Sequence, residues 1–189
     1  MLKDSVTNRM TDEDFLSFCL ENQDLRIERN SNLEIIIMSP VSTLSGLHSS
    51  EIFGQLSVWS KKDGRGIVFD ASAGFTLPDR SVLSPDASWL SLDIWHKLTE
   101  ESKDKFAPVC PEFVIEVRSK ADDLEVLREK MKVWIKNGAQ LAWLIDPREK
   151  ISFVYRNKEE IKLEGFNRKI SGEGPVKGFE LDLSQIQLY

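Results

Sequence analysis

Two apolar runs separated by a helix-like segment constrain the fold most strongly. "EFVIEV" (112–117) and "AQLAWLID" (139–146) are almost continuously apolar, as expected of strands covered on both faces. Between them, "DDLEVLREKMKVWIKNG" (122–138) has acidic residues at its start, a glycine at its end and an apolar stripe at i, i+4 and i+7. The order strand, helix, strand predicts a βαβ unit in a mixed sheet with helices on both faces.

The rest of the chain predicts elements that surround this unit. We expect an amphipathic helix at 11–22, a hairpin formed by 24–30 and 32–40, and a helix at 45–61. Three short strands follow at 66–72, 74–78 and 87–91, and a polar insertion at 92–106 separates them from the βαβ unit. Residues 150–157 alternate in polarity and should pair antiparallel with the preceding strand, and a loop-rich tail with one late strand ends the chain.

Length and composition favour a single cytoplasmic domain spanning residues 1–189. The content is 41% hydrophobic and 30% charged, close to the average for globular proteins. We expect no membrane span, no signal peptide and no disulfide or zinc site, because the two cysteines are far apart in the sequence. The net charge of −6 argues against general attraction to nucleic acid, although a local basic surface is compatible with it.

Two carboxylates stand where strands begin or run through apolar sequence. Asp86 follows Pro85 directly before the run "ASWL", and Glu116 lies inside "EFVIEV". Burying a carboxylate among such neighbours is costly unless it is paired or binds a metal. If the two side chains converge, they form an oxygen ligand set that suits Mg²⁺.

Two cations follow Glu116 at useful spacings. Arg118 shares the face of Glu116 in a regular strand, where a guanidinium could stabilise charge on a phosphate. Lys130 falls about 90° from the centre of the apolar stripe on the next helix, a border position from which a long side chain can lean toward Glu116. A lysine is better suited than an arginine to orient or activate a water molecule.

Simpler interpretations of the same residues exist. Asp86 could cap a turn, Glu116 could form an edge salt bridge with Arg118, and Lys130 could be a solvated helix residue. The histidine near the start of the second helix is most simply a surface group. The tryptophans lie in apolar patterns that indicate core positions, except Trp95 in the polar insertion.

Several stretches together resemble a known family. "SPDASW", "PEFVIEVRSK", "LREKMKVWIKNGAQLAWLIDP" and "VYR" are similar to the Uma family of restriction-endonuclease-like proteins, a branch of the PD-(D/E)XK nuclease superfamily. The likeness extends over nearly the whole chain. It implies an α/β fold with a four-stranded mixed central sheet flanked by helices, and cleavage of DNA that depends on Mg²⁺, with Mn²⁺ as the alternative ion.

The resemblance also implies roles for individual residues. Asp86 matches the aspartate of the PD motif and Glu116 the acidic residue of (D/E)XK, while Arg118 stands where that motif has lysine. Lys130 matches a helix lysine that recurs in the family and could replace it, and Glu51 is the candidate for a further metal ligand. A homodimer would suit an enzyme that cuts two strands. The alternative is a nuclease-like fold that binds or regulates without catalysis.

Overall fold

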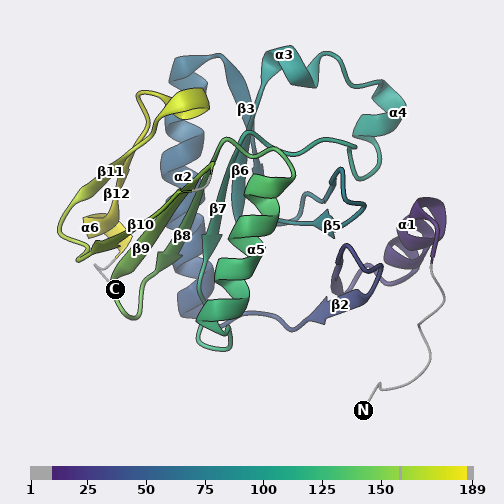
Figure 1. Cartoon of the computed structure of the whole chain (residues 1–189), viewed down its shortest axis with the longest axis horizontal. Helices are drawn as coiled ribbons and strands as arrows, with labels where there is room; N and C mark the ends of the chain where they lie inside the picture. The colour runs from purple at the N-terminus through teal and green to yellow at the C-terminus, as the bar shows by residue number, and fades with distance from the viewer. Residues whose placement is uncertain (1–9, 158, 187–189) are drawn as a thin grey trace.

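The fold is described from a computed structural model, which covers residues 10–157 and 159–186 (Figure 1). The helices are α1 (Asp12–Glu21), α2 (Thr43–Asp63), α3 (Leu92–Trp95), α4 (Glu100–Lys103), α5 (Leu124–Lys136) and α6 (Leu183–Ile186), with a 3-10 turn at Gly174–Val176. The strands are β1 (Arg26–Arg29), β2 (Ile35–Met38), β3 (Gly66–Asp70), β4 (Phe75–Thr76), β5 (Val82–Leu83), β6 (Ala87–Ser91), β7 (Phe113–Val117), β8 (Leu141–Asp146), β9 (Ile151–Arg156), β10 (Glu159–Glu164), β11 (Lys169–Ser171) and β12 (Glu180–Asp182).

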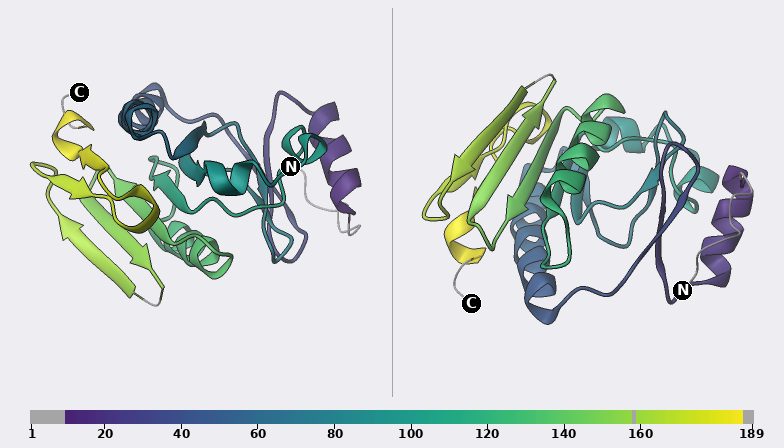
Figure 2. Two further views of the ribbon diagram at one scale, coloured as in Figure 1. Left: turned by 90° about the horizontal axis from the view of Figure 1, so that it is seen from above. Right: turned by 60° about the horizontal axis from the view of Figure 1, so that its bottom comes forward.

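A six-stranded mixed sheet in the order β10-β9-β8-β7-β6-β3 forms the centre of the molecule. β7 and β8 are parallel, and every other neighbouring pair is antiparallel. Figure 2 shows α2 on one face of this sheet and α5 on the other. The predicted βαβ unit and the α/β fold class with flanking helices are therefore confirmed. The central sheet is wider than the four strands that the resemblance implied.

The alternation of side chains along β7 divides the apolar core between the two faces. Phe113, Ile115 and Val117 join the cluster that packs beneath α2. Val114 joins the cluster beneath α5, which includes Met131 and Trp134 of that helix. Glu116 shares the face of Val114, so its carboxylate points toward α5.

The N-terminal hairpin does not extend the central sheet. It forms a separate four-stranded sheet in the order β2-β1-β5-β4, in which β2 is an edge strand. α1 lies against this small sheet (Figure 1), and its Phe15 ring is stacked under the fully buried guanidinium of Arg29. The hairpin was predicted, but its placement beside the central sheet depends on β5, a strand of two residues that the sequence did not reveal.

The insertion and the tail contain more regular structure than predicted. The polar insertion holds the short helices α3 and α4, and Trp95 packs against Phe69 there. The tail forms the antiparallel β11–β12 ribbon, where one late strand was expected. Across residues 10–157 and 159–186, helices long and apolar enough to cross a membrane are absent.

Candidate active site

A pocket of about 620 Å³ opens where β6 begins and β7 ends. Its walls come from the β2–α2 connector, the first two turns of α2, the loop after β7, and the α5 side chains Leu127 and Lys130. Asp86 and Glu116 also line it. The pocket therefore brings together residues that are far apart along the chain, from Arg26 to Lys130.

Asp86 stands one residue before β6 and reaches across to the end of β7. Its Oδ2 accepts a hydrogen bond of 2.8 Å from the backbone N–H of Val117, and Arg26 Nη2 lies 3.7 Å from Oδ1. Burial raises the pKa of Asp86, opposed by the Val117 N–H and by the charge of Arg26. The carboxylate thus joins the two strands while its second oxygen remains at the pocket.

Glu116 lies on the α5 face of β7, and its side chain is 4% exposed. Its Oε1 lies 2.9 Å from Lys130 Nζ and accepts a hydrogen bond of 2.9 Å from Trp134 Nε1. Burial raises the pKa of Glu116 to about 7; the charge of Lys130 opposes the rise and that of Asp86 adds to it. Glu116 Oε2 accepts no hydrogen bond from the described residues, so this oxygen is available to a ligand.

Lys130 lies between two carboxylates that come from different sheets. Its Nζ is 2.9 Å from Glu116 Oε1 and 3.0 Å from Glu28 Oε1. Glu28 belongs to β1 and also accepts a hydrogen bond of 2.8 Å from the backbone N–H of Ser84. Burial lowers the pKa of Lys130, but the attraction of both carboxylates outweighs burial and raises it. Lys130 therefore remains protonated and acts as a donor and a positive charge.

Arg118 does not reach this pocket. Its Nη1 lies 2.6 Å from Oδ2 of Asp146, a fully buried residue at the end of β8, and its Nε donates to the backbone oxygen of Asp122. The expectation that Arg118 would share the face of Glu116 assumed a regular strand. β7 ends at Val117, so alternation no longer sets the direction of the next side chain. Arg118 instead links β7 to β8.

Glu51 is also placed away from the two carboxylates. The α2 residues that line the pocket are Ser42 at its N-cap, Ser45 and Ser49, whereas Glu51 accepts a hydrogen bond of 3.1 Å from Gln55. Gln55 in turn contacts the backbone of Asp182 in β12. Because two residues along a helix correspond to about 200° of rotation, Glu51 faces the C-terminal ribbon when Ser49 faces the pocket.

Two contributors were not identified from the sequence. Glu28 was interpreted only as part of a hairpin strand, and Trp134 only as a core residue. The signal for Glu28 was present but weak, since Glu28 and Arg29 are charged residues in a short strand whose apolar residue is Ile27. Glu28 is 3% exposed, which requires a partner, but the sequence does not show that the partner is Lys130.

The donor set suits a hard divalent cation. Asp86 and Glu116 supply carboxylate oxygens at the mouths of neighbouring strands, and Mg²⁺ binds such oxygens while retaining several waters. The described part of the chain holds no group of three or more His, Cys, Asp or Glu side chains that could bind a metal. Water and substrate would therefore have to complete the coordination of an ion held by Asp86 and Glu116.

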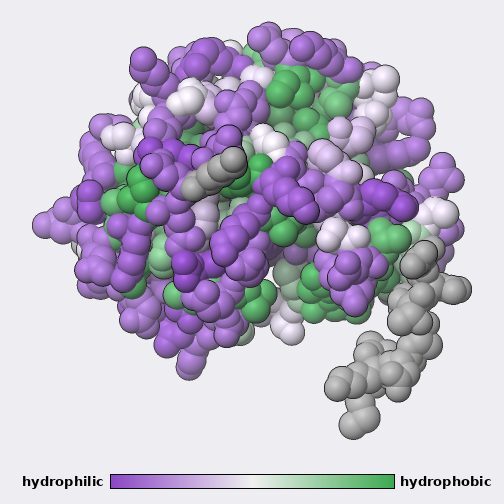
Figure 3. Space-filling model, in the orientation of Figure 1, coloured by the Kyte–Doolittle hydropathy of each residue, from purple (hydrophilic) through white to green (hydrophobic). Residues whose placement is uncertain are grey.

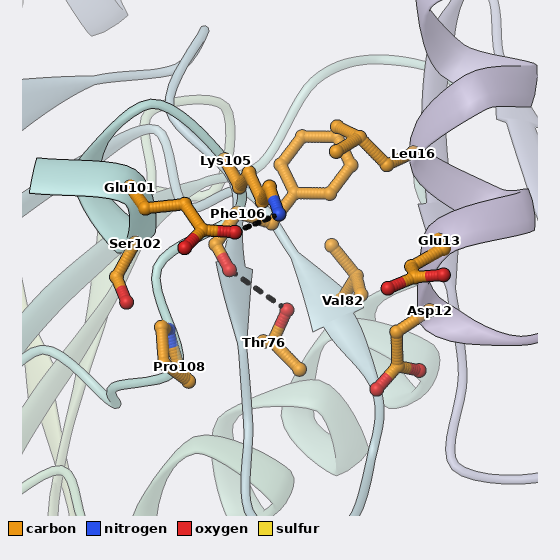
Figure 4. A pocket seen from close by; sticks show the side chains of 10 residues that line it. All are labelled: Asp12, Glu13, Leu16, Thr76, Val82, Glu101, Ser102, Lys105, Phe106 and Pro108. Atoms are coloured by element: carbon orange, nitrogen blue, oxygen red, sulfur yellow. Dashed lines mark hydrogen bonds and ion pairs between the residues drawn. The ribbon is translucent and has the colours of Figure 1, made fainter. Parts of the chain in front are cut away.

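A second hollow, of about 320 Å³, lies between α1 and the loop after α4 (Figure 4). Three of its charged side chains are already engaged: Lys105 pairs with Glu101 at 2.7 Å, and Asp12 pairs with Arg29 at 2.5 Å. Thr76 donates to the backbone oxygen of Phe106 across its floor. These contacts hold α1 against β1 and β4 against the loop after α4, so the pocket at Asp86 and Glu116 remains the better candidate for chemistry.

Known proteins support the fold and the family. The family profile described as "Uma2: Putative restriction endonuclease" matches residues 12–184. The crystal structure of a "putative nuclease belonging to DUF820" from Anabaena variabilis superposes with a TM-score of 0.76 at 20% identity, covering 94% of this chain and 97% of that one. A cryo-EM structure of a DrdV–DNA complex aligns with a TM-score of 0.39 at 11% identity, covering 64% of this chain and 12% of that one. No curated protein matches the sequence.

Proposed function

The chain belongs to the Uma2 family of restriction-endonuclease-like proteins, and we propose that it is a Mg²⁺-dependent endonuclease that hydrolyses phosphodiester bonds of DNA. The observation that carries the proposal is the contact of Lys130 with Glu116, in the pocket that Asp86 also lines. The three side chains come from three separate elements. Their convergence supplies two carboxylates for a metal and one cation for a phosphate.

In this proposal Asp86 and Glu116 hold the ion, with Mn²⁺ as a substitute for Mg²⁺. These two carboxylates would hold a divalent ion whose chemistry would be to polarise a phosphodiester and to lower the pKa of a bound water. Because the pKa of Glu116 is about 7, its carboxylate is fully available to a cation only above that pH. We therefore expect metal binding to strengthen as the pH rises through 7.

Lys130 would contribute a hydrogen-bond donor and a positive charge. Its ammonium has three N–H groups, and two point toward Glu116 and Glu28, which leaves one for a water molecule or a phosphate oxygen. The neighbouring carboxylates raise the pKa of Lys130, so a protonated amine suits this position better than a general base. We therefore assign Lys130 to positioning water and stabilising charge.

The test is cleavage of supercoiled and linear DNA with Mg²⁺ or Mn²⁺. We expect Asp86→Asn and Glu116→Gln to abolish cleavage, while Glu129→Gln on the solvent side of α5 leaves it unchanged. Glu129 is the matched control because its side chain is 68% exposed and pairs only with Lys132. Cleavage that persists in both Asp86→Asn and Glu116→Gln would refute the site.

A second candidate is a binding or regulatory module without catalysis. Two observations favour this module over an enzyme: the net charge is −6, and Arg118, which stands at the lysine position of the (D/E)XK motif, is engaged in a structural ion pair with Asp146. Calorimetric titration with Mn²⁺ distinguishes the two. Absence of both metal binding and cleavage in the unsubstituted protein would favour the module, whereas binding that is lost in Asp86→Asn supports the nuclease.

A further inference from the structure

The free edge of β2 is unusual for an edge strand. Residues 35–41 read "IIIMSPV" and carry no charge, although edge strands are commonly protected from pairing by charged residues. Ile36 is 40% exposed and Ile37 48%. In Figure 3, apolar side chains gather over the segment that Figure 1 labels β2. Within the described residues, the small sheet thus ends in an apolar strand whose outer edge pairs with no other strand.

The hydrogen-bond pattern identifies which backbone groups are free. The backbone N–H of Asn30 donates to Glu34 O, and Glu28 pairs with Ile36 in the β1–β2 register. In an antiparallel ladder alternate residues bond to the same neighbour, so Glu34, Ile36 and Met38 face β1. The N–H and C=O groups of Ile35 and Ile37 therefore point outward, where the described residues provide no neighbouring strand.

We propose that this edge pairs with β2 of a second copy of the chain, forming a two-fold symmetric dimer. A two-fold axis perpendicular to the sheet preserves the two faces, so only residues whose positions differ by an even number can stand opposite each other. Centring the axis on Ile36 places Ile35 opposite Ile37 of the partner, so that both outward-facing residues form hydrogen-bonded pairs. The edge is complementary to itself in this register.

Charge and apolar character favour a second copy over a different partner. The register places Ile36 against its own counterpart and Glu34 opposite Met38, so no like charges meet. A four-residue strand pair covers less than the roughly 1,200 Å² of a standard interface. The dimer should therefore form at micromolar rather than nanomolar concentration.

The dimer would have a consequence for the nuclease, and this step rests on the proposed function. Ile36 shares a face with Glu28, whose carboxylate holds Lys130 at the catalytic pocket. The axis keeps that face on one side, so both pockets would open on the same side of a joined eight-stranded sheet. Each pocket could then take one strand of a duplex.

The experiment places charges of opposite sign at Ile36, the residue on the two-fold axis. Sedimentation velocity without metal or DNA then measures the oligomeric state. We expect Ile36→Lys and Ile36→Glu to be monomers separately, because like charges meet, and to recover a dimer when mixed. Ile37→Pro should also be monomeric, since it removes an outward N–H and leaves the β1 ladder intact. Val58→Lys is the control and should remain dimeric, because Val58 is 57% exposed on α2 and outside β2.

Three outcomes would overturn the proposal: a monomeric unsubstituted protein across the micromolar range, a dimer that survives Ile36→Lys, or no recovery on mixing. Circular dichroism of each variant separates loss of pairing from loss of folding. The DNA assay is independent: monomeric variants should nick supercoiled DNA but lose linearisation. An inactive protein that still dimerises refutes the nuclease alone, and an active monomer refutes the dimer alone.

Discussion

Two buried ion pairs lie near the end of β7, and their surroundings differ. Glu116 pairs with Lys130, and Arg118 pairs with Asp146. Asp146 is fully buried, and its two oxygens accept from Arg118 and from the backbone N–H groups of Arg148 and Glu149. Glu116 is almost as buried, but one of its oxygens takes both contacts and the other faces a pocket. Both oxygens of Asp146 are therefore engaged within the fold, whereas Glu116 keeps one oxygen for a ligand.

A buried charge alone does not identify a functional site, because Asp146 and Glu116 are both buried carboxylates. Burying either carboxylate costs free energy that only a partner can offset. At Asp146 the partners hold a turn and two strands together. At Glu116 the raised pKa records a cost that the protein alone does not fully offset. Variants of the two pairs should therefore fail in different ways.

The largest expected effect is on stability, from Asp146→Ala. The substitution leaves Arg118 without its buried partner and the Arg148 and Glu149 amides without their acceptor, which should cost about 3–5 kcal/mol. Urea unfolding in the absence of metal measures it. Glu164→Ala, which removes the exposed Lys162 pair, is the control and should change little. A loss below about 1 kcal/mol at Asp146 would mean that the two buried pairs do not differ as described.

Lys130→Met should act mainly on the proposed chemistry. We expect cleavage to fall by about 100-fold or more, as is typical when a group that stabilises charge in the transition state is removed. Lys132→Met, on the same helix and 54% exposed, is the matched control. Cleavage rates at saturating Mn²⁺ measure the effect. Full activity in Lys130→Met would leave Lys130 as a structural counterion, comparable to Arg118.

The pH dependence of stability distinguishes the two pairs further. Glu116 has a reference pKa of 4.5 and a native pKa of about 7. Between these values the native carboxyl keeps a proton that the unfolded one releases, so stability falls as pH rises through this window, by up to about 3 kcal/mol. Glu116→Gln should flatten this decline, leaving the part due to Asp86. Urea unfolding below and above the window measures it, and an unchanged slope in Glu116→Gln would refute the assignment.

The smallest expected effect is that of Glu51→Gln. Glu51 contacts Gln55 and lies outside the pocket, so metal affinity and cleavage should remain unchanged and stability should shift by less than about 0.5 kcal/mol. Calorimetry with Mn²⁺ provides the measurement. A marked loss of metal affinity would return Glu51 to the ligand set.

Local patterns in the sequence were sufficient for the central pair of strands and for the helix between them. The apolar runs around Glu116 and the stripe of α5 predicted the βαβ unit, because a strand buried on both faces and its covering helix leave periodic signals. The same periodicity placed Lys130 at the border of α5, and the structure finds its Nζ beside Glu116. These inferences succeeded because they depend on contacts between neighbouring elements.

Only the tertiary structure decided which charged groups meet. The role of Arg118 depends on where β7 ends and on Asp146, which is 28 residues away, and the role of Glu28 depends on a lysine 102 residues away. The small sheet that carries Glu28 is joined through β5, a strand of two residues that is too short for any periodic signal. Ion pairs between distant segments leave no pattern in the sequence, because the finished fold, and not the neighbouring residues in the chain, determines which charged groups lie within reach of each other.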